Sequence, residues 1–216
     1  MIVAITYQED TGEPLASMRV PLTVASIRKA MPAARIVHMA NETFPGVPGV
    51  DEVFRYPRAG RDLIDWAYEA LATLCERADE DVLKIGTDVL LMRDVVRAFG
   101  DFDIAACRYP TRTRQDGAFC DEIVFVRPAG ARFLREVLAI YQAPDFAHRN
   151  GWEGGQTAFL AASRTTSCRL SSLDFDTYGF TPEVEGEDNV DAAIVHFRGP
   201  RKRWMMNYAA AKGIRL

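Results

Sequence analysis

The stretch Asp81–Met92, DVLKIGTDVLLM, is an apolar run that Gly86, Thr87 and Asp88 interrupt in its middle. An apolar run of this kind predicts a strand that is buried on both faces, as in a parallel sheet covered by helices. A carboxylate within such a strand is costly unless it lies at the strand's end and faces a cleft. The stretch therefore predicts a central strand of an α/β sheet, with Asp88 as a functional residue at its end.

Strand and helix patterns alternate on both sides of this stretch. The predicted strands are 2–6, 35–39, 53–56, 102–106, 122–126 and 193–197, and the predicted helices are 20–31, 61–77, 93–99, 133–141 and 156–162. Pro21 is expected in the first turn of its helix, where proline is tolerated. This alternation predicts an α/β fold with crossover connections. Ligands of open α/β sheets bind at the carboxyl ends of strands, so Asp88 and His196 are expected to share a cleft.

Composition limits the classes of partner. The chain has 216 residues, a formal net charge of −4 and a sequence pI of about 5.5, so neither nucleic acid nor an anionic membrane surface is favoured as a partner. No run approaches the roughly 20 apolar residues of a membrane span. The chain passes from Met1 directly into a strand pattern without a signal peptide, and a cytoplasmic location is expected. Four cysteines without metal-finger spacing are expected to be small buried hydrophobic residues: Cys75, Cys107, Cys120 and Cys168.

A second chemistry-bearing stretch is HFRGPRKRW, which spans residues 196–204. Neutral imidazole is a good ligand for a divalent transition metal, so His196 is a candidate metal ligand. Gly199 permits close approach of the backbone to a ligand, and Lys202 is a standard type of phosphate partner. The alternative is a last strand followed by a solvated basic turn.

This stretch resembles the C-terminal signature HFxGxxKPW of the family-eight glycosyltransferases, which include glycogenin and bacterial lipopolysaccharide galactosyltransferases. The matching residues are His196, Phe197, Gly199, Lys202 and Trp204, and Arg203 stands where the family has proline. LKIGTDVLL is similar to the family's Asp-x-Asp strand, with Gly86 in place of the first aspartate. WEGGQTAFLAA is similar to its Gly-Asp-Gln-like element, with Gly155 in place of the aspartate. The resemblance covers about residues 1 to 206.

The resemblance implies a GT-A fold, with a mixed, mostly parallel central sheet flanked by helices. It implies one GT-A-like domain over 1–216, whose basic segment 198–216 closes over the donor site. The implied donor is a nucleotide-diphosphate sugar, with uridine as the expected base, and the implied outcome is retention of configuration. Mn²⁺, or Mg²⁺, would be held by Asp88 and His196. The implied donor contacts are Lys202 and the Gly199 backbone at the diphosphate, Gln156 near the reacting carbon, and Tyr7, Arg61 and Thr87. The alternatives are that Gln156 only caps its helix, that Arg61 is an ordinary arginine at a helix start, and that Tyr7 lies at the edge of the core.

The departures from the family pattern suggest a compensation. The family has Phe-Asn-x-Gly where this chain has Phe119-Cys120-Asp121-Glu122. Asp121 and Glu122, expected just after a loop that faces the cleft, are therefore candidate catalytic residues that replace the two missing carboxylates. Glu153 is a further candidate for the same role. The preceding loop carries Arg108, Arg112 and Arg114 and is either an acceptor-side lid or a solvated loop.

Two alternatives to a metal-assisted transferase stay open on the sequence. Because Gly86 and Gly155 replace aspartates, the chain could bind a nucleotide sugar without turning it over. It could also be a metal-independent transferase in which arginine and lysine replace the cation. The acceptor, whether a glycan, a protein or another polymer end, has no sequence signature. The short chain leaves little room for an acceptor domain, so a partner is expected to present the acceptor.

Overall fold

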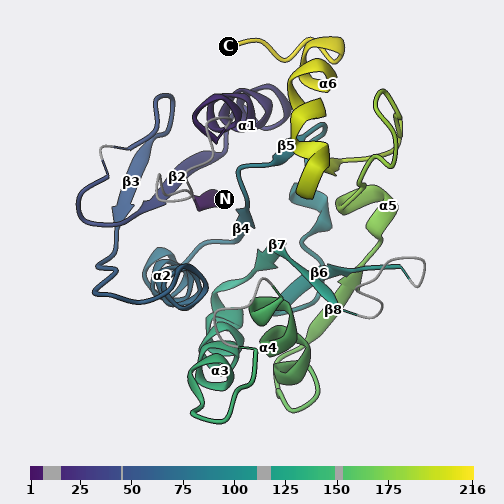
Figure 1. Ribbon diagram of the computed structural model, residues 1–216. Coiled ribbons are helices and arrows are strands. Elements are labelled where there is room, and N and C mark those ends of the chain that lie inside the picture. Colours follow the sequence, from purple (N-terminus) through teal and green to yellow (C-terminus); the bar gives the residue numbers. More distant parts are fainter. Residues whose placement is uncertain (7–15, 45, 111–117, 149–152) are drawn as a thin grey trace.

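The computed structural model describes residues 1–6, 16–44, 46–110, 118–148 and 153–216. Its centre is a seven-stranded sheet in the order β3-β2-β1-β4-β7-β6-β8 (Figure 1). The strands in this spatial order are β3 (Glu52–Arg55), β2 (Arg35–Ala40), β1 (Ile2–Thr6), β4 (Val82–Ile85), β7 (Phe119–Val126), β6 (Ile104–Arg108) and β8 (Leu170–Leu173).

The sheet is mixed and mostly parallel, as the resemblance implies. β3, β2, β1 and β4 pair in parallel, β6 pairs in parallel with β8, and β7 runs antiparallel to both of its neighbours. Because β7 is reversed, its first residues lie at the carboxyl end of β4: Ile123 pairs with Ile85, and the Gly86 N–H donates to the Glu122 carbonyl oxygen at 3.1 Å. This edge of the sheet is where ligands of α/β folds bind.

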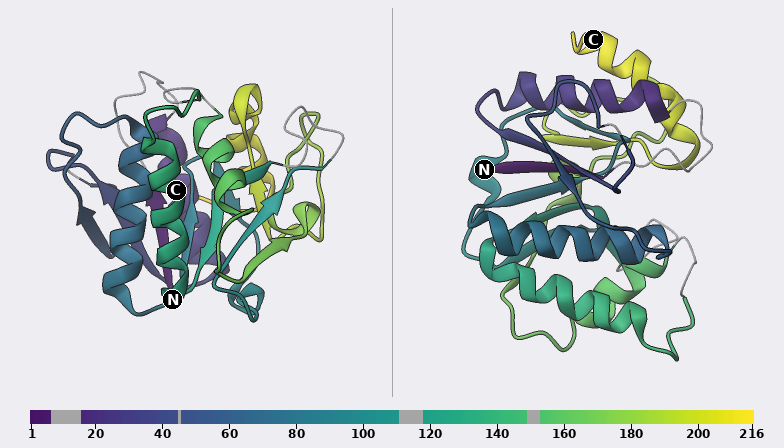
Figure 2. Two further views of the ribbon diagram at one scale, coloured as in Figure 1. Left: turned by 90° about the horizontal axis from the view of Figure 1, so that it is seen from below. Right: turned by 90° about the vertical axis from the view of Figure 1, so that its left-hand side faces the viewer.

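Helices cover both faces of the sheet (Figure 2). Helix α1 (Ala16–Ala30) lies on one face, and α2 (Leu63–Ala78), α3 (Ala131–Gln142) and α4 (Gly154–Ala162) lie on the other. Each face has its own apolar cluster: Trp66, Phe133 and Phe159 are fully buried beneath α2–α4, and Ile27 and Phe125 on the α1 side. The burial of strands on both faces explains their nearly continuous apolar sequences.

The chain leaves the main sheet immediately after β4. β5 (Val89–Leu91) pairs antiparallel with β9 (Ile194–His196) in a separate two-stranded sheet. The chain then continues through the 3₁₀ helix η4 (Gly199–Trp204) into α6 (Met205–Ala211), which packs against α1 (Figure 1). A third apolar cluster, which includes Leu90, Phe197 and Met205, holds this C-terminal unit to the fold.

The remaining elements are short. They are the 3₁₀ helices η2 (Val96–Ala98) and η3 (Pro128–Gly130) and helix α5 (Phe175–Tyr178).

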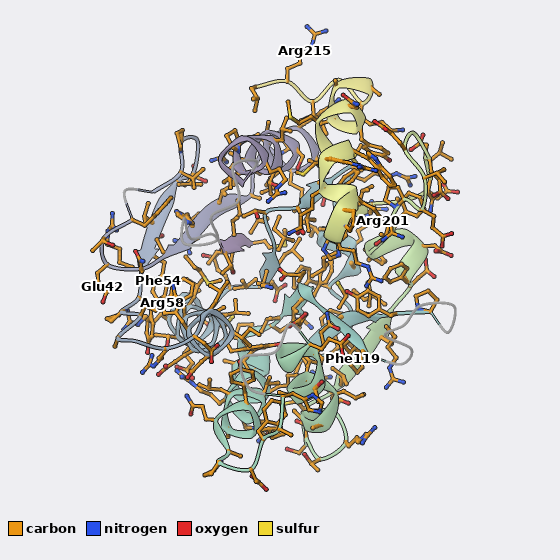
Figure 3. The ribbon with its side chains drawn as sticks, in the orientation of Figure 1. Glu42, Phe54, Arg58, Phe119, Arg201 and Arg215 are labelled. Carbon is orange, nitrogen blue, oxygen red and sulfur yellow. The ribbon has the colours of Figure 1, made fainter. Side chains whose placement is uncertain are left out.

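In Figure 3, Glu42, Phe54 and Arg58 lie together at the β3 edge, where the Arg58 N–H donates to the Glu42 carboxylate at 3.3 Å. Phe119 lies in the half that holds β7, and Arg201 in the C-terminal segment. None of the helices in the described part of the chain is both long and apolar enough to cross a membrane.

Several predicted boundaries are wrong. The stretch 81–92 forms two strands in two sheets rather than one interrupted strand, and 93–99 forms only the turn η2. β7 begins at Phe119 because Phe119 pairs with Arg108 beyond a register shift that leaves extra residues in β7, so Asp121 lies within a strand. The sequence analysis did not predict β8. Pro21 lies beyond the first turn, because α1 begins at Ala16.

Two further details concern the cysteines and α2. Cys75, Cys107 and Cys120 are buried free thiols as predicted, but Cys168 is only half-buried. The predicted start of the long helix at Arg61 is also early. Asp62 is the N-cap: its Oδ1 accepts from the backbone N–H groups of Ile64 and Asp65, both at 2.9 Å. A capping carboxylate satisfies donors that the first turn leaves unpaired.

Candidate active site

The pairing of β5 with β9 brings Asp88 and His196 together. Val89 is the register partner of His196, and the Phe197 N–H donates to the Asp88 carbonyl oxygen at 2.8 Å. The two predicted residues are separated by more than a hundred positions in the chain, yet they lie on neighbouring strands. The proximity of the two residues therefore has a simple structural basis, which is the two-stranded sheet beside the carboxyl end of β4.

The Asp88 carboxylate faces two basic side chains. His196 Nε2 lies 3.4 Å from Asp88 Oδ1, and Lys202 Nζ lies 3.4 Å from Asp88 Oδ2. Asp88 is 8% exposed and His196 2% exposed. Burial opposes charge on both groups, but the Asp88 carboxylate raises the pKa of His196 to about 10. His196 and Lys202 in turn outweigh burial and hold the pKa of Asp88 well below its ordinary value. The site thus concentrates charge in a buried place.

The His196 ring is held from both sides. Its Nδ1 lies 3.6 Å from the Sγ atom of Cys120, which is buried in β7, while Nε2 faces Asp88. A partner at each ring nitrogen fixes the orientation of an imidazole. Cys120 therefore supports the site as well as packing in the core. Its place next to the predicted acids in β7 was visible in the sequence, but its contact with His196 was not.

Two hydroxyl groups of α1 support β5 from the other edge. Thr23 Oγ1 donates to the carbonyl oxygens of Thr87 and Val89 at 3.2 and 3.0 Å, and Ser26 Oγ accepts from the Leu91 N–H at 3.0 Å. Both side chains are fully buried. β5 is therefore hydrogen-bonded to β9 on one side and to a helix on the other, which fixes the backbone that carries Asp88.

The start of β7 forms an acidic wall at the same edge. Lys84, in the middle of β4, donates to the Asp121 carbonyl oxygen at 2.6 Å and pairs with Glu122 Oε2 at 3.0 Å. Burial and the Glu122 charge raise the pKa of Asp121 to about 6. Lys84 itself is nearly buried, and the two acids outweigh that burial and raise its pKa. Lys84 was not among the predicted site residues, although a lysine inside the apolar strand VLKI is a sequence signal of a buried ion pair.

Helix α4 places Gln156 beside Asp121. The Gln156 side chain is 7% exposed and hydrogen-bonds to the Asp121 carboxylate, and its Oε1 atom has no hydrogen-bond partner among the described residues. The Tyr68 hydroxyl lies 3.5 Å from both Asp121 Oδ2 and the Gly155 carbonyl oxygen. An acceptor that is buried without a donor points to a ligand that supplies one.

Other predicted residues have different surroundings. Arg61 forms an ion pair with Glu69 on α2. Gly199 adopts a φ of +59°, which favours glycine, at the start of η4. The Thr87 backbone accepts from Thr23, and Glu153 is exposed at the N-terminus of α4. Arg108 lies over the Phe119 ring at 4.7 Å. The predicted residues Tyr7, Arg112 and Arg114 lie outside the described part of the chain.

Two side chains of the site have the chemistry to bind a divalent cation. Asp88 and His196 offer one oxygen and one nitrogen that face each other, which is a donor pair that suits Mn²⁺. Among the described residues no group of three or more His, Cys, Asp or Glu side chains could hold a metal. The two donors therefore fit a cation only if its remaining ligands would come from outside the described side chains.

Comparison with solved structures identifies the fold. The glycosyltransferase GlyE of Streptococcus pneumoniae TIGR4 matches 99% of this chain with a TM-score of 0.64 at 13% identity, and this chain spans 64% of GlyE. A glycosyltransferase involved in glycosylation of the PBCV-1 major capsid has a TM-score of 0.64 at 12% identity, and the match covers 97% of this chain and 98% of that protein. For an active-site mutant of LgtC the TM-score is 0.60 at 14% identity, and the match covers 98% of this chain and 95% of LgtC.

Neither a protein-family model nor a curated protein matches the sequence. At these low identities the structural matches are evidence for the fold alone. They agree with the family resemblance of the two stretches that form the site, residues 81–92 and 196–204. The predicted architecture is confirmed: this chain has the GT-A fold of the glycosyltransferases.

Proposed function

We propose that this protein is a glycosyltransferase that takes a sugar from a nucleotide-diphosphate donor, with uridine diphosphate as the expected carrier. One observation carries the proposal: Asp88, His196 and Lys202 meet at the carboxyl edge of the sheet in a GT-A fold. The chain supplies these three groups from two distant segments, and each is of the residue type that diphosphate chemistry requires.

The reaction needs positive charge at the leaving group. Breaking the bond between sugar and diphosphate develops negative charge on the phosphate oxygens and cationic character on the sugar. Lys202 binds these oxygens in this proposal, which is supported by its partly exposed side chain and its position beside Asp88. The backbone at Gly199 opens the same turn. Gln156 stands beside Asp121 on the sugar side, and the resemblance implies a retaining outcome there.

A divalent cation would be held by Asp88 and His196 and would neutralise the diphosphate. The protonated imidazole must lose its proton before it can bind a metal. Because the Asp88 charge favours the protonated ring, we expect cation affinity to rise with pH. The segment 198–216 is then the part of the domain that closes the donor site, through Lys202 in η4. The acceptor class stays open, and a partner is expected to present it.

A metal-independent transferase is the second candidate. The observation that favours it is the pairing of Asp88 with Lys202 and with a protonated His196, which places two cationic groups in the site without a metal. In that case Lys202 and neighbouring arginines stabilise the diphosphate, and Asp88 binds a ribose hydroxyl.

Thermal unfolding with uridine diphosphate and other nucleotide diphosphates, each with and without Mn²⁺, tests both forms. Ligand at a hundredfold excess over its Kd stabilises a protein by about 2.7 kcal/mol. Stabilisation that needs Mn²⁺ supports the metal-assisted form, and stabilisation without it supports the second candidate. Asp88→Asn should abolish the Mn²⁺-dependent shift, whereas the exposed control Asp191→Asn should keep it. Binding without any hydrolysis or transfer of a donor sugar would mean a binding module, and no binding would refute the proposal.

A further inference from the structure

Two glycines of the candidate site stand where an added side chain would meet a carboxylate of β7. A Cβ atom built on Gly86 would lie 2.5 Å from Glu122 Oε2 and 3.1 Å from Asp88 Oδ1. A Cβ atom built on Gly155 would lie 2.3 Å from Asp121 Oδ2. Neither glycine has a positive φ, so a larger residue at these positions would have to displace a neighbouring carboxylate but would not strain the backbone. In both places the space is filled by a carboxylate of β7.

An irregularity in β7 lets the two neighbouring carboxylates reach two different elements. The register between β6 and β7 shifts between Ala106 and Arg108, so the regular alternation of a strand is broken here. Asp121 lies beside Gly155 at the start of α4, and Glu122 lies beside Gly86 at the end of β4. Because β7 is antiparallel to β4, both residues lie at the carboxyl edge of the sheet, where Glu122 shares the surroundings of Gly86 with Asp88.

The groups on this wall are hydrogen-bond acceptors. The carboxylates of Asp121 and Glu122 lie next to Gly155 and Gly86, and the buried Gln156, which hydrogen-bonds to Asp121, has an Oε1 atom without a hydrogen-bond partner among the described residues. Acceptors of this kind repel a phosphate and attract hydroxyl groups, which donate to carboxylates in charge-assisted hydrogen bonds. Lys84 neutralises part of the negative charge through its pair with Glu122 at 3.0 Å, so the wall can stay ionised.

We propose that Asp121 and Glu122 form the hydroxyl-binding wall of the donor site. They occupy the room that glycine leaves at positions 155 and 86, and they accept hydrogen bonds from hydroxyl groups of the sugar nucleotide. The carboxylates of the site thus come from β7 instead of from the two positions where the related glycosyltransferases carry them. The identity of the ligand in this inference rests on the proposed function. The packing of each β7 carboxylate against a glycine, called the glycine–carboxylate packing below, does not depend on the proposed function.

A double-mutant cycle on stability tests the glycine–carboxylate packing without any ligand. Gly155→Ala should lower the unfolding midpoint by several degrees in the wild-type chain and by little in an Asp121→Ala background. Gly86→Ala should behave in the same way with Glu122→Ala. Gly100→Ala is the matched control, since the nearest atom to its added Cβ lies at 3.8 Å, and it should not depend on either background. If a glycine substitution lowers the unfolding midpoint equally in both backgrounds, the glycine–carboxylate packing is refuted.

Binding measurements test the role of the wall. With uridine diphosphate and its glucose, galactose and N-acetylglucosamine conjugates as probes, Asp121→Ala and Glu122→Ala should each weaken the best conjugate at least tenfold. Adding Gly155→Asp to Asp121→Ala, or Gly86→Asp to Glu122→Ala, should restore a part of that loss, because a carboxylate returns from the opposite side. If wild type binds a probe and both alanine variants bind it equally well, the wall is refuted and the proposed function stands. If wild type binds none, both are refuted.

Discussion

Replacing Asp121 by asparagine should make the protein more stable at neutral pH and remove part of its pH dependence. Burial and the Glu122 charge raise the pKa of Asp121 from 3.8 to about 6. Below pH 3.8 the carboxyl group is protonated in both the folded and the unfolded chain. As the pH rises, the unfolded chain ionises first, so the free energy of unfolding falls until the folded carboxyl also ionises near pH 6. An asparagine does not ionise and avoids this loss.

The size of the effect follows from that pKa. One pKa unit corresponds to about 1.4 kcal/mol, so the rise from 3.8 to about 6 sets an upper limit of about 3 kcal/mol. Asp121 is half-buried in β7, and solvent lowers this figure, so we expect about 1 to 3 kcal/mol. In a chain of 216 residues, each kcal/mol moves the unfolding midpoint by about 2 to 4 °C.

Urea unfolding of wild type and Asp121→Asn between pH 3.5 and pH 8 measures the difference directly. Groups that titrate equally in both proteins cancel, so the difference should be near zero at the acid end, grow between pH 4 and pH 6, and stay constant above. Asp191→Asn, which changes an exposed carboxylate, should show no such curve. A difference that is independent of pH, or an asparagine variant that is less stable at pH 8, would show that Asp121 is not strained by its surroundings.

Three further substitutions test the supports of the site and fold. Lys84→Met should cost about 1–3 kcal/mol in urea unfolding, because Glu122 loses a charge-assisted partner, and it should raise the pKa of Asp121 further in a pH titration of stability. Thr23→Val should cost about 1–2 kcal/mol by removing the buried hydroxyl beneath β5, whereas the exposed Thr43→Val should cost little. Asp62→Ala should cost about 0.5–2 kcal/mol in thermal unfolding by uncapping α2, and an unchanged midpoint would contradict that capping role.

The glycine substitutions and Asp121→Asn both ask whether the β7 carboxylates are kept for ligand binding at a cost in stability. If the β7 carboxylates serve a ligand, their placement costs stability in the free protein, and Asp121→Asn should gain stability and lose affinity together. Such a trade is common where a site holds polar groups in strained surroundings. An Asp121→Asn variant that is more stable and binds equally well would separate the two properties and leave the acidic wall without a functional reason.

Part of the site was readable from local sequence because its residues lie in short, chemically distinctive stretches. Asp88 interrupts an apolar strand, and His196 and Lys202 lie in one basic segment, so both stretches stood out without a structure. Lys84 was equally visible but does not interrupt the hydrophobic character of its strand enough to be noticed. Its function depends on Glu122, a partner in another strand. Charge inside a strand is a local signal, but the partner that makes it stable is not.

The sequence by itself determined the class of fold, since alternating apolar strands and amphipathic helices can bury their apolar surface only in a layered α/β arrangement. It also determined which residue types could serve a diphosphate. Only the tertiary structure decided that β4 and β5 belong to different sheets, because β9, the partner of β5, lies over a hundred residues away. Only the tertiary structure showed that carboxylates of β7 lie against positions 86 and 155, because such contacts through space leave no periodic pattern along the chain.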